Sequence, residues 1–216
     1  MKPYQALAAG LLLAATGAQA QSADSALARA QQAYDAMRTL RAEFTQSLIN
    51  PMLGAPEASS GTMYLAPPGK FAMRFSDPAG DRVVADGQWL WIYTPSTVPD
   101  QVIRQPIPEA GANTPNLFQQ FVDHPRQRYA VTFLRPDTAA GEPVAVLRFV
   151  PRREGLPFRE AVMAVARRDG WPRRLWLVEE SGQRRELVFQ RIEVNGDIPP
   201  AELQFAVPRG TKVVTP

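Results

Sequence analysis

The residue types that most often carry out catalysis are scarce in this 216-residue chain. It contains one histidine, His124, and no cysteine. Acyl- and phosphoryl-transfer enzymes need an activated nucleophile, a general base or a phosphate-binding loop, and the base is most often histidine. The sequence has no Gly-x-Ser-x-Gly, His-x-x-x-His or Walker motif. We therefore expect a protein that is not an enzyme, with no catalytic residues, no metal and no cofactor, and interpret His124 as a surface or capping residue.

One adjacent carboxylate pair, Glu179 and Glu180, remains to be weighed. The two side chains would act as general acid and general base only if both faced one cleft. Successive side chains of a strand point to opposite faces, which disfavours that arrangement. Carboxylates distant in sequence could still meet in space, so a secreted hydrolase stays open as an alternative.

Large apolar side chains form the candidate binding site, because they recur on segments expected to be neighbouring strands and helices. The residues predicted to line an acyl-chain cavity are Met63, Leu65, Phe71, Met73, Phe75, Trp89, Trp91 and Tyr93. Those predicted to form a lid are Leu27, Tyr34, Met37, Leu117, Phe118 and Phe121. Methionine and aromatic side chains adapt to irregular guests, but ordinary cores use them too. Composition therefore leaves two interpretations open: a packed β core, or a curled sheet whose interior is lined and not filled.

A mainly β fold with two helical pieces must position these residues. Between residues 23 and 41 apolar side chains recur every three or four positions, which predicts an amphipathic helix. After Phe44, short alternating runs separated by Gly and Pro predict about eleven antiparallel strands. Asp86 and Gly87 predict a tight hairpin between two such runs. A short second helix is expected to begin at Thr114-Pro115.

The first twenty residues have the parts of a secretory signal: Lys2, an apolar run from Ala6 to Ala15, and Ala18-Gln19-Ala20 before the expected cleavage point. We predict a signal peptide at residues 1–20 and a single domain at residues 21–216. Without cysteine there is neither a lipid-anchor site nor a disulfide. The formal net charge of +3 is nearly balanced, and we expect no nucleic-acid partner. We interpret the Arg-Arg pairs as solvated strand faces, and a face that steers anionic head groups or acidic partners stays open as the alternative.

Six short stretches follow one another in a recognisable order. They are Leu40-Arg41-Ala42-Glu43-Phe44-Thr45-Gln46 at the end of the expected first helix, Gly61-Thr62-Met63-Tyr64-Leu65 with Pro68-Gly69-Lys70-Phe71, Val84-Ala85-Asp86-Gly87-Gln88, Asn113-Thr114-Pro115, Arg168-Asp169-Gly170, and Phe205-x-Val207-Pro208-x-Gly210. Together they resemble the periplasmic outer-membrane lipoprotein carrier family, the LolA family. The resemblance implies an incomplete, half-open antiparallel β-barrel of about eleven strands, with a helical lid over a hydrophobic cavity.

The resemblance also implies a function. A family member is a periplasmic chaperone that takes acylated lipoproteins from an inner-membrane ABC-type lipoprotein-releasing complex and delivers them to an outer-membrane lipoprotein receptor. We expect a monomer, and our hypothesis is that Leu117, Phe118 and Phe121 plug the empty barrel and leave when cargo enters.

Two departures from the family pattern bear on the lid and the cargo. Pro67 stands where the family commonly has an arginine that hydrogen-bonds the lid, and Met73 stands where an aromatic residue is common. They leave open a related carrier of another acylated molecule or a glycolipid. Outside the family, a secreted polysaccharide-binding β domain would place Trp89 and Trp91 on an exposed platform.

Overall fold

The computed structural model describes residues 23–52, 54–107, 116–156 and 158–216. Its strands are β1 (Leu40–Ile49), β2 (Pro56–Ala66), β3 (Lys70–Asp77), β4 (Arg82–Asp86), β5 (Trp89–Tyr93), β6 (Gln101–Pro106), β7 (Tyr129–Ala139), β8 (Glu142–Pro151), β9 (Phe158–Ala166), β10 (Pro172–Glu179), β11 (Arg184–Val194) and β12 (Lys212–Val214). The helical elements are the N-terminal helix (residues 23–35), α2 (Leu117–Val122), α3 (Pro125–Arg128) and the 3-10 helix η1 (Pro200–Leu203).

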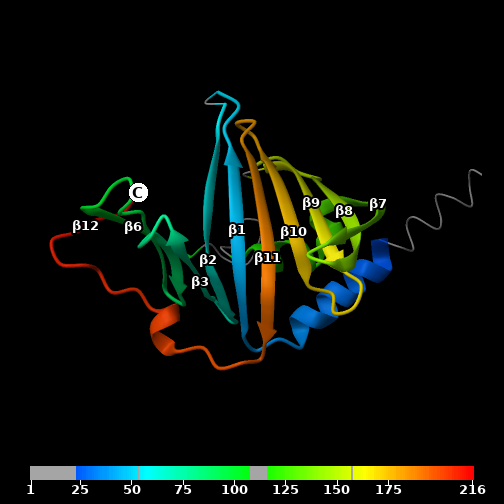
Figure 1. The fold of residues 1–216 in the computed structure, drawn as a ribbon, viewed down its shortest axis with the longest axis horizontal. Coiled ribbons are helices and arrows are strands. Elements are labelled where there is room, and N and C mark those ends of the chain that lie inside the picture. Colours follow the sequence, from blue (N-terminus) through cyan, green and yellow to red (C-terminus); the bar gives the residue numbers. More distant parts are fainter. Residues whose placement is uncertain (1–22, 53, 108–115, 157) are drawn as a thin grey trace, which may run out of the picture.

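In the described part of the chain these strands form one twelve-stranded sheet, in the order β12-β6-β5-β4-β3-β2-β1-β11-β10-β9-β8-β7. Neighbours are antiparallel except β12, which pairs with β6 in parallel. The long strands β1 and β11 stand side by side in the middle, and the sheet curves away from them on both sides (Figure 1). Its two edges, β7 and β12, do not meet. The predicted mainly β, incomplete barrel is therefore confirmed, with one strand more than expected.

The hairpin predicted at Asp86 and Gly87 joins β4 to β5. The Asp86 carboxylate accepts hydrogen bonds from the backbone amides of Gln88 and Trp89, each at 2.8 Å. Gly87 has φ of +101°, a left-handed conformation that glycine adopts without steric cost. The prediction of a tight turn is confirmed.

The first helix is shorter than predicted. It ends at residue 35, and Leu40–Ile49 form β1. Leu40, Ala42 and Phe44 are buried in alternation along that strand, while its backbone pairs with β2 on one side and β11 on the other. The stretch from Leu40 to Gln46, expected at the end of the helix, is therefore a central strand. Pairing on both edges outweighs the helical periodicity, because it satisfies the backbone donors and acceptors of the whole strand.

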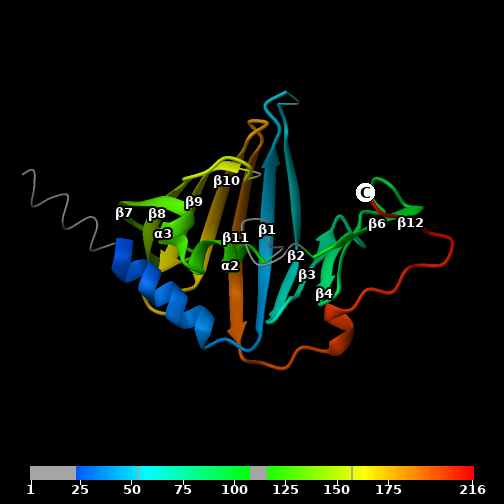
Figure 2. The same cartoon turned by 180° about the vertical axis from the view of Figure 1, so that it is seen from behind.

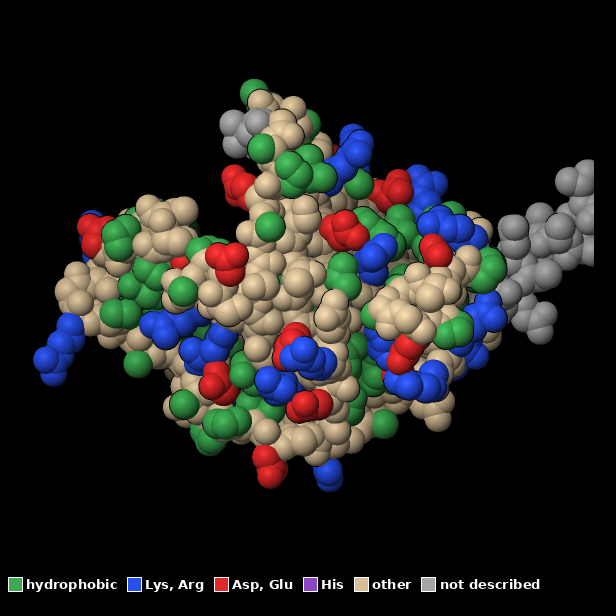
Figure 3. Space-filling model, viewed as in Figure 1, with side chains coloured by type: hydrophobic (Ala, Val, Ile, Leu, Met, Phe, Trp, Pro, Cys, Tyr) green, Lys and Arg blue, Asp and Glu red, His purple; other side chains and the backbone are tan. Residues whose placement is uncertain are grey.

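The sheet has an inner and an outer face, and the N-terminal helix, α2 and α3 lie on the inner one (Figure 2). The inner face carries the main hydrophobic core. The outer face carries two smaller apolar clusters and scattered charges of both signs (Figure 3). Residues 195–214, here called the C-terminal segment, run from β11 to the β6 edge (Figure 1). Among the described residues, no helix has the length and apolar character needed to cross a membrane.

Candidate functional site, the inner face beneath the helices

Five of the eight residues predicted to line a cavity lie together on the inner face. Met63, Leu65, Phe71 and Met73 are buried in the main core, and Phe75 packs against it. The cross-strand register explains the grouping, because Met63 lies opposite Met73 and Leu65 lies opposite Phe71. Their role as an acyl-chain lining stays a prediction.

The other three predicted cavity residues, Trp89, Trp91 and Tyr93, face the other way. They belong to an outer-face cluster with Leu203 and Phe205 of the C-terminal segment, and Trp91 stacks on Phe205 with 5.1 Å between ring centroids. On β5 it is Leu90 and Ile92 that reach the inner face. The prediction that all eight share one face was wrong. The alternation along β5 was visible in the sequence, but nothing local showed that a distant segment would cover its aromatic side.

Two phenylalanines of helix α2 pack against the concave side of the sheet. Phe118 is 2% exposed and packs between Trp171 and Phe189, at centroid distances of 6.1 and 5.0 Å. Phe121 is 0% exposed and lies 5.2 to 5.6 Å from the rings of Tyr129, Phe149 and Phe158. These five partner residues, in β7, β8, β9, β11 and the turn before β10, were not singled out from sequence. Leu117 is part of α2, but its side chain lies outside what the structure describes.

Asn116 begins α2 and ties it to the N-terminal helix. Its side-chain oxygen accepts hydrogen bonds from the amides of Phe118 and Gln119, while its side-chain nitrogen donates to the Tyr34 hydroxyl at 2.8 Å. Thr114-Pro115, the predicted start of this helix, lie outside the described residues. A second contact joins the Arg126 guanidinium of α3 to the Asp24 carboxylate, with Nε 2.6 Å from Oδ1. The helices are thus held to one another by polar contacts.

The remaining predicted lid residues, Leu27 and Met37, are both buried in the main core. Leu27 lies in the N-terminal helix, whereas Met37 follows the end of that helix. Both therefore pack beneath the helical layer, although Met37 is not itself helical.

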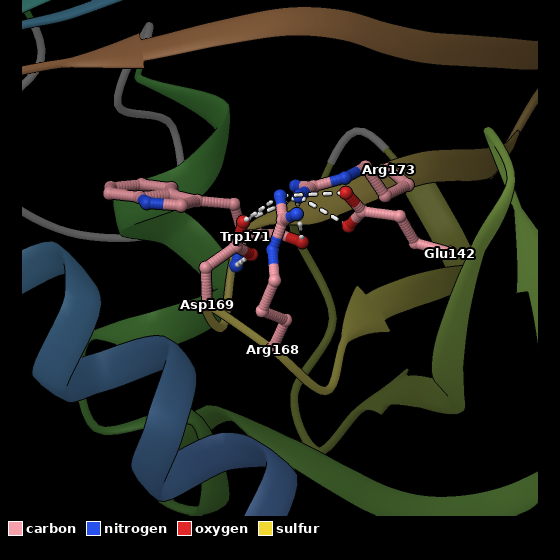
Figure 4. A network of polar contacts seen from close by, with 5 residues as sticks. All are labelled: Glu142, Arg168, Asp169, Trp171 and Arg173. Atoms are coloured by element: carbon pink, nitrogen blue, oxygen red, sulfur yellow. Dashed lines mark hydrogen bonds and ion pairs between the residues drawn. The ribbon is translucent and has the colours of Figure 1, made fainter.

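A network of charged groups holds the turn between β9 and β10 (Figure 4). The side chain of Arg173 is 6% exposed, and its Nη2 lies 2.6 Å from the Asp169 carboxylate and 2.8 Å from that of Glu142. The exposed Arg168 binds the second oxygen of Glu142 at 2.7 Å. Burial raises the pKa of Asp169, but the Trp171 amide and the Arg173 guanidinium outweigh it and hold the pKa below its ordinary value. The sequence-based interpretation of the Arg-Arg pairs as solvated was therefore wrong for Arg173.

This turn touches the helices at two neighbouring residues. A Cβ on Gly170 would lie 2.5 Å from the backbone oxygen of Arg29, so the N-terminal helix rests directly on the glycine. The next residue, Trp171, contacts Phe118 of α2. Arg168-Asp169-Gly170 had a visible sequence signal as a turn, but its contact with the helices is long-range and had none.

A pocket of about 530 Å³ opens between the N-terminal helix and the α2–α3 pair. Leu27, Ala28 and Val122 form its apolar side, and Asp24, Asp35 and Arg126 form much of its polar side. On the side of the helices that faces solvent, the pocket separates the N-terminal helix from α2 and α3. Elsewhere the hydrogen bond between Tyr34 and Asn116 joins them. The pocket therefore lies along a seam of the helical layer.

The residues considered for catalysis do not form a site. The His124 side chain is 72% exposed, with Nδ1 2.7 Å from the Asp123 carboxylate. Glu179 is paired with Arg185 at 3.2 Å, and Glu180 is exposed. Within the described ranges, no group of three or more His, Asp or Glu side chains is arranged to hold a metal ion.

Comparison with known proteins gives one family match and many curated relatives. The model of the family described as "Outer membrane lipoprotein carrier protein LolA" matches residues 35–206. The chain is 28% identical over 177 residues to the outer-membrane lipoprotein carrier protein of Dechloromonas aromatica, covering 82% of this chain and 81% of that protein. The protein of the same name from Chromobacterium violaceum is 27% identical over 216 residues, with 100% and 99% covered.

Solved structures share the fold at lower identity. An uncharacterized conserved protein from Thermus thermophilus superposes with a TM-score of 0.57 and 14% identity, over 90% of this chain and 99% of the other. MucB gives a TM-score of 0.52 and 18% identity, over 85% of this chain and 62% of its own length. At these identities the likeness concerns the fold alone.

Proposed function

The chain belongs to the outer-membrane lipoprotein carrier family, since that family's model matches most of its length, and we propose from this that it carries lipoproteins by sheltering their acyl chains on the inner face of its sheet. The observation that supports the proposal is the seating of α2. Phe118 and Phe121 occupy the concave side, where they contact the rings of the sheet and its turn. A short helix is easier to displace than a core strand, because it shares no sheet hydrogen bonds with its neighbours.

The physical need for such a carrier follows from the cargo. Burying one CH₂ is worth about 0.8 kcal/mol, so a C16 chain resists transfer to water by roughly 12 kcal/mol. In our proposal α2 and the acyl chains compete for the same apolar surface. Cargo must then displace Phe118 and Phe121, and this cost keeps the net affinity moderate enough for release without ATP.

The remaining features of the proposal concern place and partners. The carrier works in the periplasm as a monomer after removal of residues 1–20, and has no enzymatic activity. It receives lipoproteins from an inner-membrane ABC-type complex and passes them to an outer-membrane receptor. A polysaccharide-binding role gains no support from Trp91, because the C-terminal segment covers that ring.

The experiment that tests the proposal locates the acyl chains. Protein purified from the periplasm is examined by native mass spectrometry for bound acylated species. It is then incubated with a synthetic lipopeptide that carries a photoreactive diazirine at the end of a C16 chain. We expect crosslinks to inner-face residues such as Met63, Phe71 and Phe189.

Two outer-face residues provide the internal control for this experiment. Trp91 and Trp176 are large and apolar, and they lie in the outer-face clusters. Labelling confined to these two residues, or a complete absence of bound lipopeptide, would contradict the proposed function.

A further inference from the structure

One polar atom in the apolar interior has no hydrogen-bond partner among the described residues. Tyr129, the first residue of β7, is 0% exposed, and its hydroxyl oxygen is buried without a hydrogen bond to any of them. Its ring lies 5.6 Å from Phe121, 5.8 Å from Phe149 and 6.1 Å from Phe158. Buried hydroxyls are nearly always paired, and leaving one unpaired costs free energy. This atom therefore calls for an explanation.

The contrast with Tyr34 shows that the chain does pair such groups elsewhere. The Tyr34 hydroxyl accepts a hydrogen bond from Asn116, whereas the side chain of Tyr129 lies among the rings of three phenylalanines. Burial also raises the pKa of Tyr129 to about 12. A tyrosine hydroxyl is protonated at neutral pH in either case, so its proton is available to donate.

The aromatic box around Tyr129 has two walls from the sheet, Phe149 and Phe158, and one from α2, Phe121. Tyr129, Phe149 and Phe158 come from β7, β8 and β9, and Phe121 contacts all three. When α2 leaves, as the proposed function requires, Phe121 leaves with it, and Tyr129 then borders the space that the Phe121 ring vacates.

An acyl chain differs from an alkyl chain by its carbonyl group. Each ester- or amide-linked chain brings one acceptor oxygen to the apolar interior, where the acceptor needs a donor. We propose that the Tyr129 hydroxyl donates a hydrogen bond to a carbonyl oxygen of the cargo's acyl linkage, and so distinguishes acyl from alkyl lipids. This inference rests on the proposed function and adds to it a residue that selects the ligand class.

The test combines one protein change with one ligand change. Wild type and Tyr129→Phe, each as the full mature chain, are titrated with a lipopeptide bearing two ester-linked C16 chains and with its ether-linked analogue, which has no carbonyls. We expect wild type to bind the ester three- to tenfold more tightly, roughly the value of one net hydrogen bond. Tyr129→Phe should bind both ligands equally.

Unfolding of the unliganded proteins provides the second readout. Tyr129→Phe should have a urea midpoint equal to or above that of wild type, because it removes an unpaired polar atom. The matched control is Tyr93→Phe, which removes an outer-face hydroxyl that donates to the Pro99 carbonyl; it should not raise the midpoint and should retain the ester preference.

The outcomes separate the two ideas. Retention of the ester preference by Tyr129→Phe, or a lower midpoint with equal loss of affinity for both ligands, overturns the role of the hydroxyl and leaves the carrier function standing. Failure of wild type to bind either ligand overturns the proposed function and this inference together.

Discussion

Truncation of Phe118 to alanine should strengthen cargo binding while it weakens the unliganded protein. Phe118 is almost fully buried, and removal of a core phenylalanine side chain costs about 3–5 kcal/mol. Its contacts with Phe189 and Trp171 are made only while α2 is seated, so the loss falls on the closed state. We take about 3 kcal/mol as the loss in free energy of the closed state, the low end of the range, because Phe121 still holds α2 on the sheet.

The consequence for affinity follows from competition between the helix and the cargo. If α2 must leave before acyl chains enter, each 1.4 kcal/mol removed from the closed state raises the apparent affinity about tenfold. Phe118→Ala should therefore bind a fluorescent lipopeptide up to about a hundredfold more tightly. Its urea midpoint without ligand should fall. Titration calorimetry and equilibrium unfolding measure the two quantities.

The control for this prediction is Val146→Ala. Val146 is buried in an outer-face cluster that contains none of the helices, so its truncation lowers stability without touching the competition. Its lipopeptide affinity should equal that of wild type. If Phe118→Ala lowers the midpoint but binds lipopeptide no more tightly than Val146→Ala does, α2 and cargo do not compete and the reasoning fails.

Two further predictions concern the helical layer and its titration. Gly170→Ala should lower the free energy of unfolding by at least about 1 kcal/mol more than Gly141→Ala does. Both glycines have φ of +77°, but of the two only Gly170 faces a backbone atom, the Arg29 oxygen. Equal urea midpoints for the two variants would argue against direct contact of the helix with this turn. Stability should also fall from about pH 10 to pH 12, since burial raises the pKa values of Tyr34 and Tyr129 to about 12, and in that window the unfolded chain loses protons that the folded chain keeps. Unfolding followed at about pH 8, 10 and 11 would measure the decline, and the double variant Tyr34→Phe, Tyr129→Phe should show a shallower one.

Local sequence patterns predicted the helices and strands better than they predicted which residues pack against each of them. The hairpin at Asp86 and Gly87 and the alternating strand runs were predictable, because turn chemistry and period-two alternation act over a few residues. The true end of the first helix was not predictable, because the helical spacing of apolar residues continues as far as Leu40. The stretch that begins at Leu40 is a strand because β2 and β11 pair with it, and the local pattern does not indicate that pairing. The face of the sheet on which Trp91 lies was equally unpredictable, because it depends on packing against Phe205, which is distant in the sequence.

The candidate site shows the same division. Phe118 and Phe121 stood out in the sequence as the apolar side of a short helix, and their burial on the inner face agrees with that pattern. Their partners Phe189 and Tyr129 did not stand out, because each is one alternating residue in a strand like many others. The anchoring role of Arg173 depends on Glu142, across a neighbouring hairpin, and no local signal indicates such a pair.

The C-terminal segment covers surfaces that would otherwise promote self-association of the protein. It covers the rings of Trp91 and Tyr93 and supplies β12, which caps the exposed backbone edge of β6. Bare strand edges and stacked aromatic surfaces both promote self-association. A chain cut after residue 196 would present the two together, and it should aggregate even with its inner face intact. Colloidal solubility thus rests on residues remote from the surface proposed to hold lipid.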